Sequence, residues 1–186
     1  MTMAIFCAVK SGEGHVQWPV GYSEPQWYAA YTWANHEKRV ADQFVERRVE
    51  HFLPTFESIR HWKDRRMRIQ QPLFSGYIFV RLALQDRLRV LQVPSVVRLV
   101  SFNGRPAVLS DQEVDILRKS LIPELRALPH PYLKVGRRVR IVKGPLYGAE
   151  GVVVRKKNGF RFVLLMDLIM RAASVDVDAA DIQAIP

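Results

Sequence analysis

The chain has 186 residues, 48% of them hydrophobic, and 28 Lys and Arg against 18 Asp and Glu give it a formal net charge of +10. This composition excludes a wholly disordered chain and is enough for one domain or two small ones. The basic excess favours a polyanionic partner such as nucleic acid. A single cysteine, Cys7, excludes an internal disulfide framework and favours a reducing compartment.

Targeting and membrane signals are missing from the sequence pattern. The apolar start MTMAIFCAVK has no basic leader, and no run approaches the roughly 20 apolar residues that cross a bilayer. We therefore expect a cytoplasmic protein that does not contact a membrane.

The chain opens with residues 1–24, which are rich in Gly, Pro and Ser and are expected to form a flexible arm. The alternating aromatic stretch WYAAYTW (27–33) then predicts a strand. Asn35 is placed to cap a helix that begins at His36. Apolar residues recur at helical spacing after it, at Val40, Ala41, Phe44, Val45 and Val49.

Extended sequence follows this helix. TFESIRHW (55–62) and PLFSGYIFVRL (72–82) predict strands on either side of a basic stretch, and residues 84–91 predict a short helix. VVRLVSF (96–102) predicts another strand, followed by an NGRP turn. Ser110 with Glu113 forms a capping box for a further helix. This order predicts an α+β fold, with helices packed against a mostly antiparallel sheet.

The last third of the chain has a different pattern. PELRALPHPYL (123–133) contains three prolines and predicts a linker. Residues 134–186 consist of short strand patterns separated by turn signals, as in a small closed barrel. Within VGRRVRIVKGPLYGAEGVVV (135–154), Gly136 and Gly144 bracket a strand where the chain turns. Gly148 and Gly151 are expected to let it reverse tightly.

The stretch 135–154 resembles the KOW unit, an SH3-like β-barrel. WYAAYTWANHEKRVADQFVERRVEHFLP, PLFSGYIFV and VPSVVRLVSFNGRPAVLSDQEVDIL resemble successive parts of the NusG N-terminal domain, an antiparallel sheet flanked by helices. From about Pro25 to its end, the chain is thus similar to NusG-family transcription elongation and antitermination factors. It looks most like the specialised RfaH/UpxY-like branch. The expected division is an arm (1–24), a NusG N-terminal domain (25–122), a linker (123–133) and a KOW domain (134–186).

The resemblance implies that the N-terminal domain binds the clamp helices of RNA polymerase and suppresses pausing or termination. Aromatic side chains suit such a contact, because they bury a large area at a low cost in entropy. We expect Tyr31, Phe74 and Tyr77 to be exposed, although alternation along the strands also sends rings into the core. The matching positions are Tyr31, Phe74, Tyr77, Phe79 and Phe102.

The basic stretch RHWKDRRMR (60–68) is expected on an elongated hairpin beside upstream or non-template DNA. Its cations would neutralise phosphates, and an aromatic ring would stack on an unpaired base. The alternative is a solvated hairpin with weak non-specific attraction to nucleic acid. The candidate nucleic-acid-binding residues are Trp33, Lys38, Arg39, Lys63, Arg65, Arg66 and Arg68.

The resemblance also implies that the KOW domain recruits a partner, either a small-subunit ribosomal protein or the Rho termination factor. The candidate contact residues are Ile169, Met170 and Arg171. The family pattern has Phe-Gly where this chain has Ile169 and Met170, so an apolar side chain is kept. The alternative is an ordinary barrel edge.

An enzyme is not expected, because the five histidines lack metal-ligand spacing and no phosphate loop or nucleophile elbow is present. We therefore expect no metal or cofactor. We also expect the factor to be a monomer. Two other interpretations stay open: a housekeeping NusG acting with Rho and the ribosome, and a ribosome-associated KOW protein that binds RNA. PLFSGYIFV argues against the second, because a simple RNA binder does not need this aromatic patch.

Overall fold

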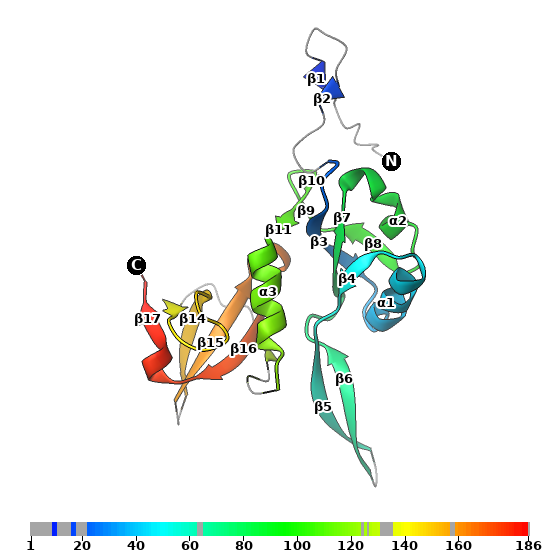
Figure 1. The fold of residues 1–186 in the computed structure, drawn as a ribbon. Coiled ribbons are helices and arrows are strands. Elements are labelled where there is room, and N and C mark those ends of the chain that lie inside the picture. The colour runs from blue at the N-terminus through cyan, green and yellow to red at the C-terminus, as the bar shows by residue number, and fades with distance from the viewer. Residues whose placement is uncertain are drawn as a thin grey trace.

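The computed structural model describes residues 9–10, 16–17, 22–62, 65–123, 125, 127–130, 136–156 and 159–185. The arm predicted over 1–24 therefore lies largely outside the described residues, apart from the paired strands β1 (Val9–Lys10) and β2 (Val16–Gln17) and the residues next to β3. Figure 1 shows a helix-covered sheet, a barrel, and the helix α3 (Asp111–Ser120) between them.

The N-terminal domain is built on an antiparallel sheet with β3 (Gln26–Thr32) at its centre. On one side β3 pairs with β7 (Tyr77–Leu82), and β7 pairs with β4 (Glu50–Phe52). On its other side β3 pairs with β8 (Val96–Leu99) and β11 (Val108–Leu109). These pairings, and the helices around them, confirm the predicted α+β fold.

The two faces of this sheet bury different sets of side chains, since successive residues of a strand point to opposite faces. One face packs against α1 (Glu37–Glu46), η1 (Leu84–Asp86) and α2 (Leu88–Leu91). Its cluster includes Tyr28, Ala30, Val40, Phe44, Ile78, Val80 and Val90. The opposite face packs against α3, in a cluster that includes Trp27, Ala29, Phe79, Leu109, Val114 and Leu117.

Two local predictions around α1 and β7 were wrong. Asn35 does not cap α1: it has φ of +65°, and His36 is the N-cap residue, without a side-chain hydrogen bond. The strand predicted over 72–82 begins only at Tyr77, because Gly76 adopts φ of +81° and the chain turns there. By contrast, the predicted capping box is confirmed: the Glu113 N–H donates to Ser110 Oγ at 3.2 Å.

Two hairpins extend from the N-terminal domain. The longer one consists of β5 (Thr55–Trp62) and β6 (Arg65–Pro72), paired from Thr55 opposite Pro72 to Trp62 opposite Arg65. It projects well beyond the rest of the domain (Figure 1). The shorter hairpin consists of β9 (Ser101–Phe102) and β10 (Arg105–Pro106).

The C-terminal domain is the predicted barrel of short antiparallel strands. It contains β13 (Arg137–Ile141), β14 (Glu150–Lys156), β15 (Gly159–Met166), β16 (Arg171–Val177) and β17 (Ile182–Ala184). The short helices η2 (Asp167–Ile169) and η3 (Ala179–Asp181) join the later strands. Strand β12 (Leu128–His130) pairs with β16, so part of the segment predicted as a linker belongs to the barrel sheet.

Gly151 has a different role from the predicted one. It lies within β14 and not in the turn, and a Cβ there would clash with the Val163 carbonyl oxygen and lie 2.7 Å from the Phe162 ring. Gly148 does lie in the turn, with φ of +83° and open space around it. Gly151 is therefore required by close packing between β14 and β15.

No helix in the described part of the chain is long and apolar enough to cross a membrane.

Gly151→Ala is expected to lower the free energy of unfolding by about 3 kcal/mol, because the new methyl group meets a backbone carbonyl that cannot rotate away. Gly148→Ala adds only backbone strain and is expected to lower it by about 1 kcal/mol. Urea denaturation of the two variants measures the difference. An equal loss, or a smaller one for Gly151→Ala, would contradict the packing role.

Candidate functional site

Aromatic rings gather on the sheet face that α3 partly covers. Tyr31 and Tyr77 are opposite each other on β3 and β7, with ring centroids 5.3 Å apart. The Phe79 ring meets the Phe74 ring edge to face, with centroids 6.2 Å apart. It stacks on the Phe52 ring, with centroids 6.1 Å apart. We call this set the aromatic face: Trp27, Tyr31, Phe52, Phe74, Tyr77 and Phe79.

The exposure of these rings changes along the face. Tyr31 is 36% exposed and Tyr77 is half-buried, whereas Phe74 is 2% and Phe79 0% exposed. The expectation that Phe74 is exposed was therefore wrong. The turn before β7 brings its ring edge-on to Phe79 instead. Phe102, also predicted for this surface, lies on the separate β9–β10 hairpin and is 75% exposed.

Arginines from three elements lie over rings of the aromatic face: Arg98 of β8 over Tyr31, Arg118 of α3 and Arg171 of the barrel. The Arg118 guanidinium of α3 lies 5.0 Å from the centroid of the Trp27 ring and 5.2 Å from that of Phe52. The Arg171 guanidinium of the barrel lies 5.8 Å from the centroid of the Tyr77 ring. A predicted partner-binding residue of the barrel therefore contacts a predicted polymerase-binding residue of the sheet.

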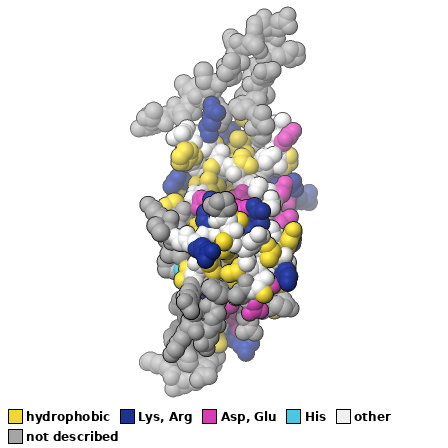
Figure 2. Space-filling model, turned by 90° about the vertical axis from the view of Figure 1, so that its left-hand side faces the viewer, with side chains coloured by type: hydrophobic (Ala, Val, Ile, Leu, Met, Phe, Trp, Pro, Cys, Tyr) yellow, Lys and Arg dark blue, Asp and Glu magenta, His cyan; other side chains and the backbone are white. Residues whose placement is uncertain are grey.

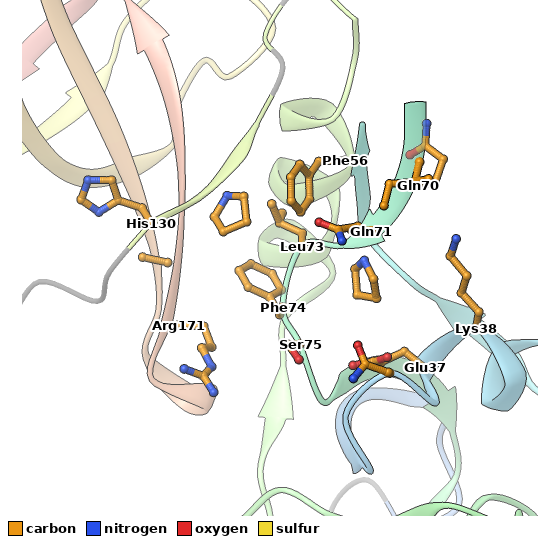
Figure 3. Close-up of a pocket in the computed structure, with 15 residues that line it drawn as sticks. Glu37, Lys38, Phe56, Gln70, Gln71, Leu73, Phe74, Ser75, His130 and Arg171 are labelled. Carbon is orange, nitrogen blue, oxygen red and sulfur yellow. The ribbon is translucent and has the colours of Figure 1, made fainter. Parts of the chain in front are cut away.

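A cleft of about 710 Å³ opens beside this contact. Figure 3 shows Phe56, Leu73 and Phe74 on one side of it and His130 and Arg171 on the barrel side. Buried side chains of both domains also belong to one continuous hydrophobic cluster, which includes Phe74, Phe79, Leu117, Met166 and Ile169. This docking between the domains was not predicted from the sequence.

Glu37, which the sequence analysis missed, fixes the turn beneath the cleft. Its side chain is buried at 1% exposure, and its Oε1 accepts a hydrogen bond from the Gly76 N–H at 2.6 Å. The Gly76 carbonyl accepts from the Thr32 N–H at 2.8 Å. Glu37 thereby positions the turn that carries Phe74. An acid in a first helical turn is ordinarily read as a complement to the helix dipole, so nothing in the sequence marked this role.

Trp33 is held at the surface by its neighbours. It is 63% exposed, and its ring meets the His36 ring edge-on at 5.7 Å. His36 Nδ1 is hydrogen-bonded to Ser95 Oγ at 2.8 Å. Lys38 and Arg39 are exposed at the start of α1, so these three candidates share one region of the surface.

The remaining nucleic-acid candidates belong to the long hairpin. Arg68 is exposed and its Nε lies 3.4 Å from Glu57 Oε1, an ion pair in water that contributes little to stability. Lys63 and the side chains of Arg65 and Arg66 lie outside the described residues.

The three candidate residues of the KOW domain differ in exposure. Ile169 is buried at 4% exposure and Met170 is 51% exposed, with φ of +51°. Arg171 is exposed and contacts Tyr77. The barrel side of the molecule shows Lys and Arg side chains scattered among hydrophobic and polar ones (Figure 2). Among the described residues, no group of three or more His, Cys, Asp or Glu side chains is arranged to hold a metal ion.

Comparison with known proteins gives consistent matches. A family model described as "Transcription termination factor nusG" matches residues 25–118. The transcription termination/antitermination protein NusG of Lactococcus lactis is 30% identical over 176 residues, covering 86% of this chain and 92% of the relative. The corresponding protein of Escherichia coli (strain K12) is 28% identical over 174 residues, covering 85% of this chain and 95% of the relative.

A solved structure, described as "Domain interaction in Thermotoga maritima NusG", matches 89% of this chain and 100% of that chain, with a TM-score of 0.57 and 23% identity. This likeness shows a shared fold. The family match and the curated relatives define a transcription termination/antitermination factor. The chain belongs to the NusG family, which is a family of transcription factors.

Glu37→Ala is expected to lower the free energy of unfolding by about 1–3 kcal/mol, because it leaves the Gly76 N–H without its buried acceptor. Glu37→Gln keeps an oxygen acceptor and is expected to lose less. The exposed Glu46→Ala in the same helix serves as a control and is expected to change the value by no more than about 0.5 kcal/mol. Chemical denaturation measures all three, and a Glu37→Ala value equal to the control would refute this role.

Proposed function

We propose that this protein is a non-enzymatic elongation and antitermination factor that binds the RNA polymerase clamp helices through the exposed end of its aromatic face. The observation that carries the proposal is the Tyr31–Tyr77 pair, which lies at the solvent-accessible end of the aromatic face. Family membership supports a role in transcription. Cytoplasmic location and a monomeric state belong to the same proposal.

The physical case rests on how the rings are supported. Tyr77 packs against the buried cluster that contains Phe74 and Phe79, so its ring is supported by the core and loses little freedom when a partner binds. Aromatic and arginine side chains dominate the energetics of protein interfaces. Arg98, whose guanidinium lies 5.7 Å from the Tyr31 ring centroid, extends the same surface. This arrangement suits the apolar side of a helical partner.

Tyr31→Ala combined with Tyr77→Ala is expected to weaken polymerase binding at least about tenfold, through the loss of two central rings. Phe74 is unsuitable for this test, because removing a fully buried ring costs about 3–5 kcal/mol of stability. Co-purification with polymerase and titration of the complex give the readout, with circular dichroism confirming the fold. Val45→Ala is the control, since this side chain is 66% exposed on α1, away from the aromatic face. Binding retained by the double variant would remove the aromatic face from the proposal.

The long β5–β6 hairpin is proposed to lie against upstream or non-template DNA, together with the surface that Trp33, Lys38 and Arg39 form. Its projection from the domain supports this role, because a narrow two-stranded arm reaches a partner that the body of the domain does not (Figure 1). Exposed cations on such an arm neutralise phosphates and release counterions. Trp33 offers an exposed ring for an unpaired base.

Replacing Lys63, Arg65, Arg66 and Arg68 by Ala is expected to weaken DNA binding and to flatten its salt dependence, by about one unit of logarithmic slope for each lost phosphate contact. Arg105→Ala with Lys119→Ala removes two exposed cations elsewhere and serves as the control. Fluorescence anisotropy with a forked DNA duplex at several salt concentrations measures the slopes. Equal slopes for the two variants would mean that the hairpin charges are merely solvated.

The barrel is proposed to recruit a ribosomal protein or a termination factor through Met170 and Arg171, with Ile169 supporting them from below. Since Arg171 also contacts Tyr77, barrel recruitment and polymerase binding draw on adjoining surfaces. We further propose a specialised role at a subset of transcription units. Genome-wide occupancy decides this point: binding at nearly all units would identify a housekeeping factor instead.

A further inference from the structure

The turn between β13 and β14 displays a tyrosine on an ordered loop. Tyr147 is 73% exposed, whereas its neighbour Leu146 is buried at 3%. The Gly148 N–H donates to the Ile141 carbonyl at 2.8 Å, and the Ala149 N–H donates to the Leu146 carbonyl at 2.9 Å. The ring therefore stands in solvent on a fixed backbone, which makes it a ready surface for stacking.

A cleft of about 400 Å³ lies beside this ring. Its size falls within the range of about 300–1,000 Å³ that is usual for small-ligand sites. The barrel contributes Arg140 and Gln183 to its lining, and α3 of the N-terminal domain contributes Gln112. Side-chain amides both donate and accept hydrogen bonds, and a guanidinium donates several. The cleft thus combines an aromatic ring with groups that match the polar edge of a nucleobase.

The strand and loop beside the cleft are basic. Residues 137–150 contain four cationic side chains and one carboxylate, and the cations Arg137, Arg138, Arg140 and Lys143 are all exposed. Glu150 accepts a hydrogen bond from Arg140 Nε at 3.0 Å and lies 3.6 Å from Arg138 Nη2. The bond from Arg140 lowers the pKa of Glu150, so this carboxylate stays ionised and holds the two guanidinium groups side by side.

We propose that this cleft binds one unpaired base of a single-stranded RNA. The Tyr147 ring stacks on the base, Gln112 and Gln183 bond its edge, and the nearby cations neutralise the adjoining phosphates. We assign RNA to the cleft because a transcription factor meets both DNA and RNA. The long hairpin is the surface proposed above for DNA, which leaves RNA for the cleft. Since Gln112 comes from α3 and the other groups come from the barrel, the site is complete only when the two domains are docked.

The test uses the full-length chain with Lys63, Arg65, Arg66 and Arg68 replaced by Ala, so that the hairpin does not mask a second site. Anisotropy of a labelled oligouridylate is measured against the same sequence as DNA. Tyr147→Ala is expected to lower RNA affinity at least about fivefold, the lower limit for losing one base–aromatic stack. Tyr147→Phe keeps the ring and the affinity. Gln112→Ala is expected to lower affinity about two- to tenfold, through lost hydrogen bonding.

Leu88→Ala is the control, because it removes an exposed apolar side chain from α2 of the other domain without touching the cleft. Thermal unfolding checks that each variant is folded, and crosslinking with 4-thiouridine RNA is expected to label Tyr147. Equal RNA affinity of Tyr147→Ala and Tyr147→Phe would overturn the proposal. The proposal would also be overturned if the chain with the four hairpin cations replaced did not bind RNA. A Tyr147→Ala variant that lost affinity for DNA but not for RNA would overturn it as well. None of these measurements involves polymerase, so the outcome is separate from that of the proposed function.

Discussion

Helix α3 packs Val114 and Leu117 against the sheet face that carries Trp27 and Phe79, and all four side chains are buried. Each buried aliphatic or aromatic side chain contributes about 1.5–3 kcal/mol of hydrophobic stabilisation. The partly exposed cation–π contacts of Arg118 and Arg171 contribute about 0.5–1 kcal/mol each. Apolar packing beneath α3 therefore holds the structure together, and the arginine over Tyr77 is a weak contact by comparison.

This difference in strength divides the aromatic face into two parts. The rings under α3 belong permanently to the core, because exposing them would lose the hydrophobic free energy of several buried side chains. At the Tyr31–Tyr77 end, the cation–π contacts among the described residues are those of Arg98 with Tyr31 and Arg171 with Tyr77. One face of one sheet thus provides both the core that α3 closes and the more exposed end that is proposed above to bind polymerase.

The sequence predicted the elements better than their assembly. Alternation identified β3 and the barrel strands, and the Ser110–Glu113 pair located the start of α3, because these signals are local. The break before β7 was missed, since the buried Glu37 that bonds Gly76 lies 39 residues earlier in the chain. Burial of Phe74 was also missed because it depends on a contact with another element. The sequence pattern of an aromatic residue in an extended stretch is the same whether its ring faces solvent or packs against Phe79. Docking of Arg171 on Tyr77 joins two domains and leaves no trace in the spacing of residues.

Strand β12 sets a limit on how far the two halves of the molecule can separate. Strand β12 is paired into the barrel from Leu128, and α3 ends at Ser120. The linker between them is therefore seven residues long, 121–127. Fully stretched, that length of chain reaches about 25 Å. A partner bound to the barrel, as proposed above, would therefore lie close to the N-terminal domain. The two domains are joined by a short tether and not by a long flexible linker.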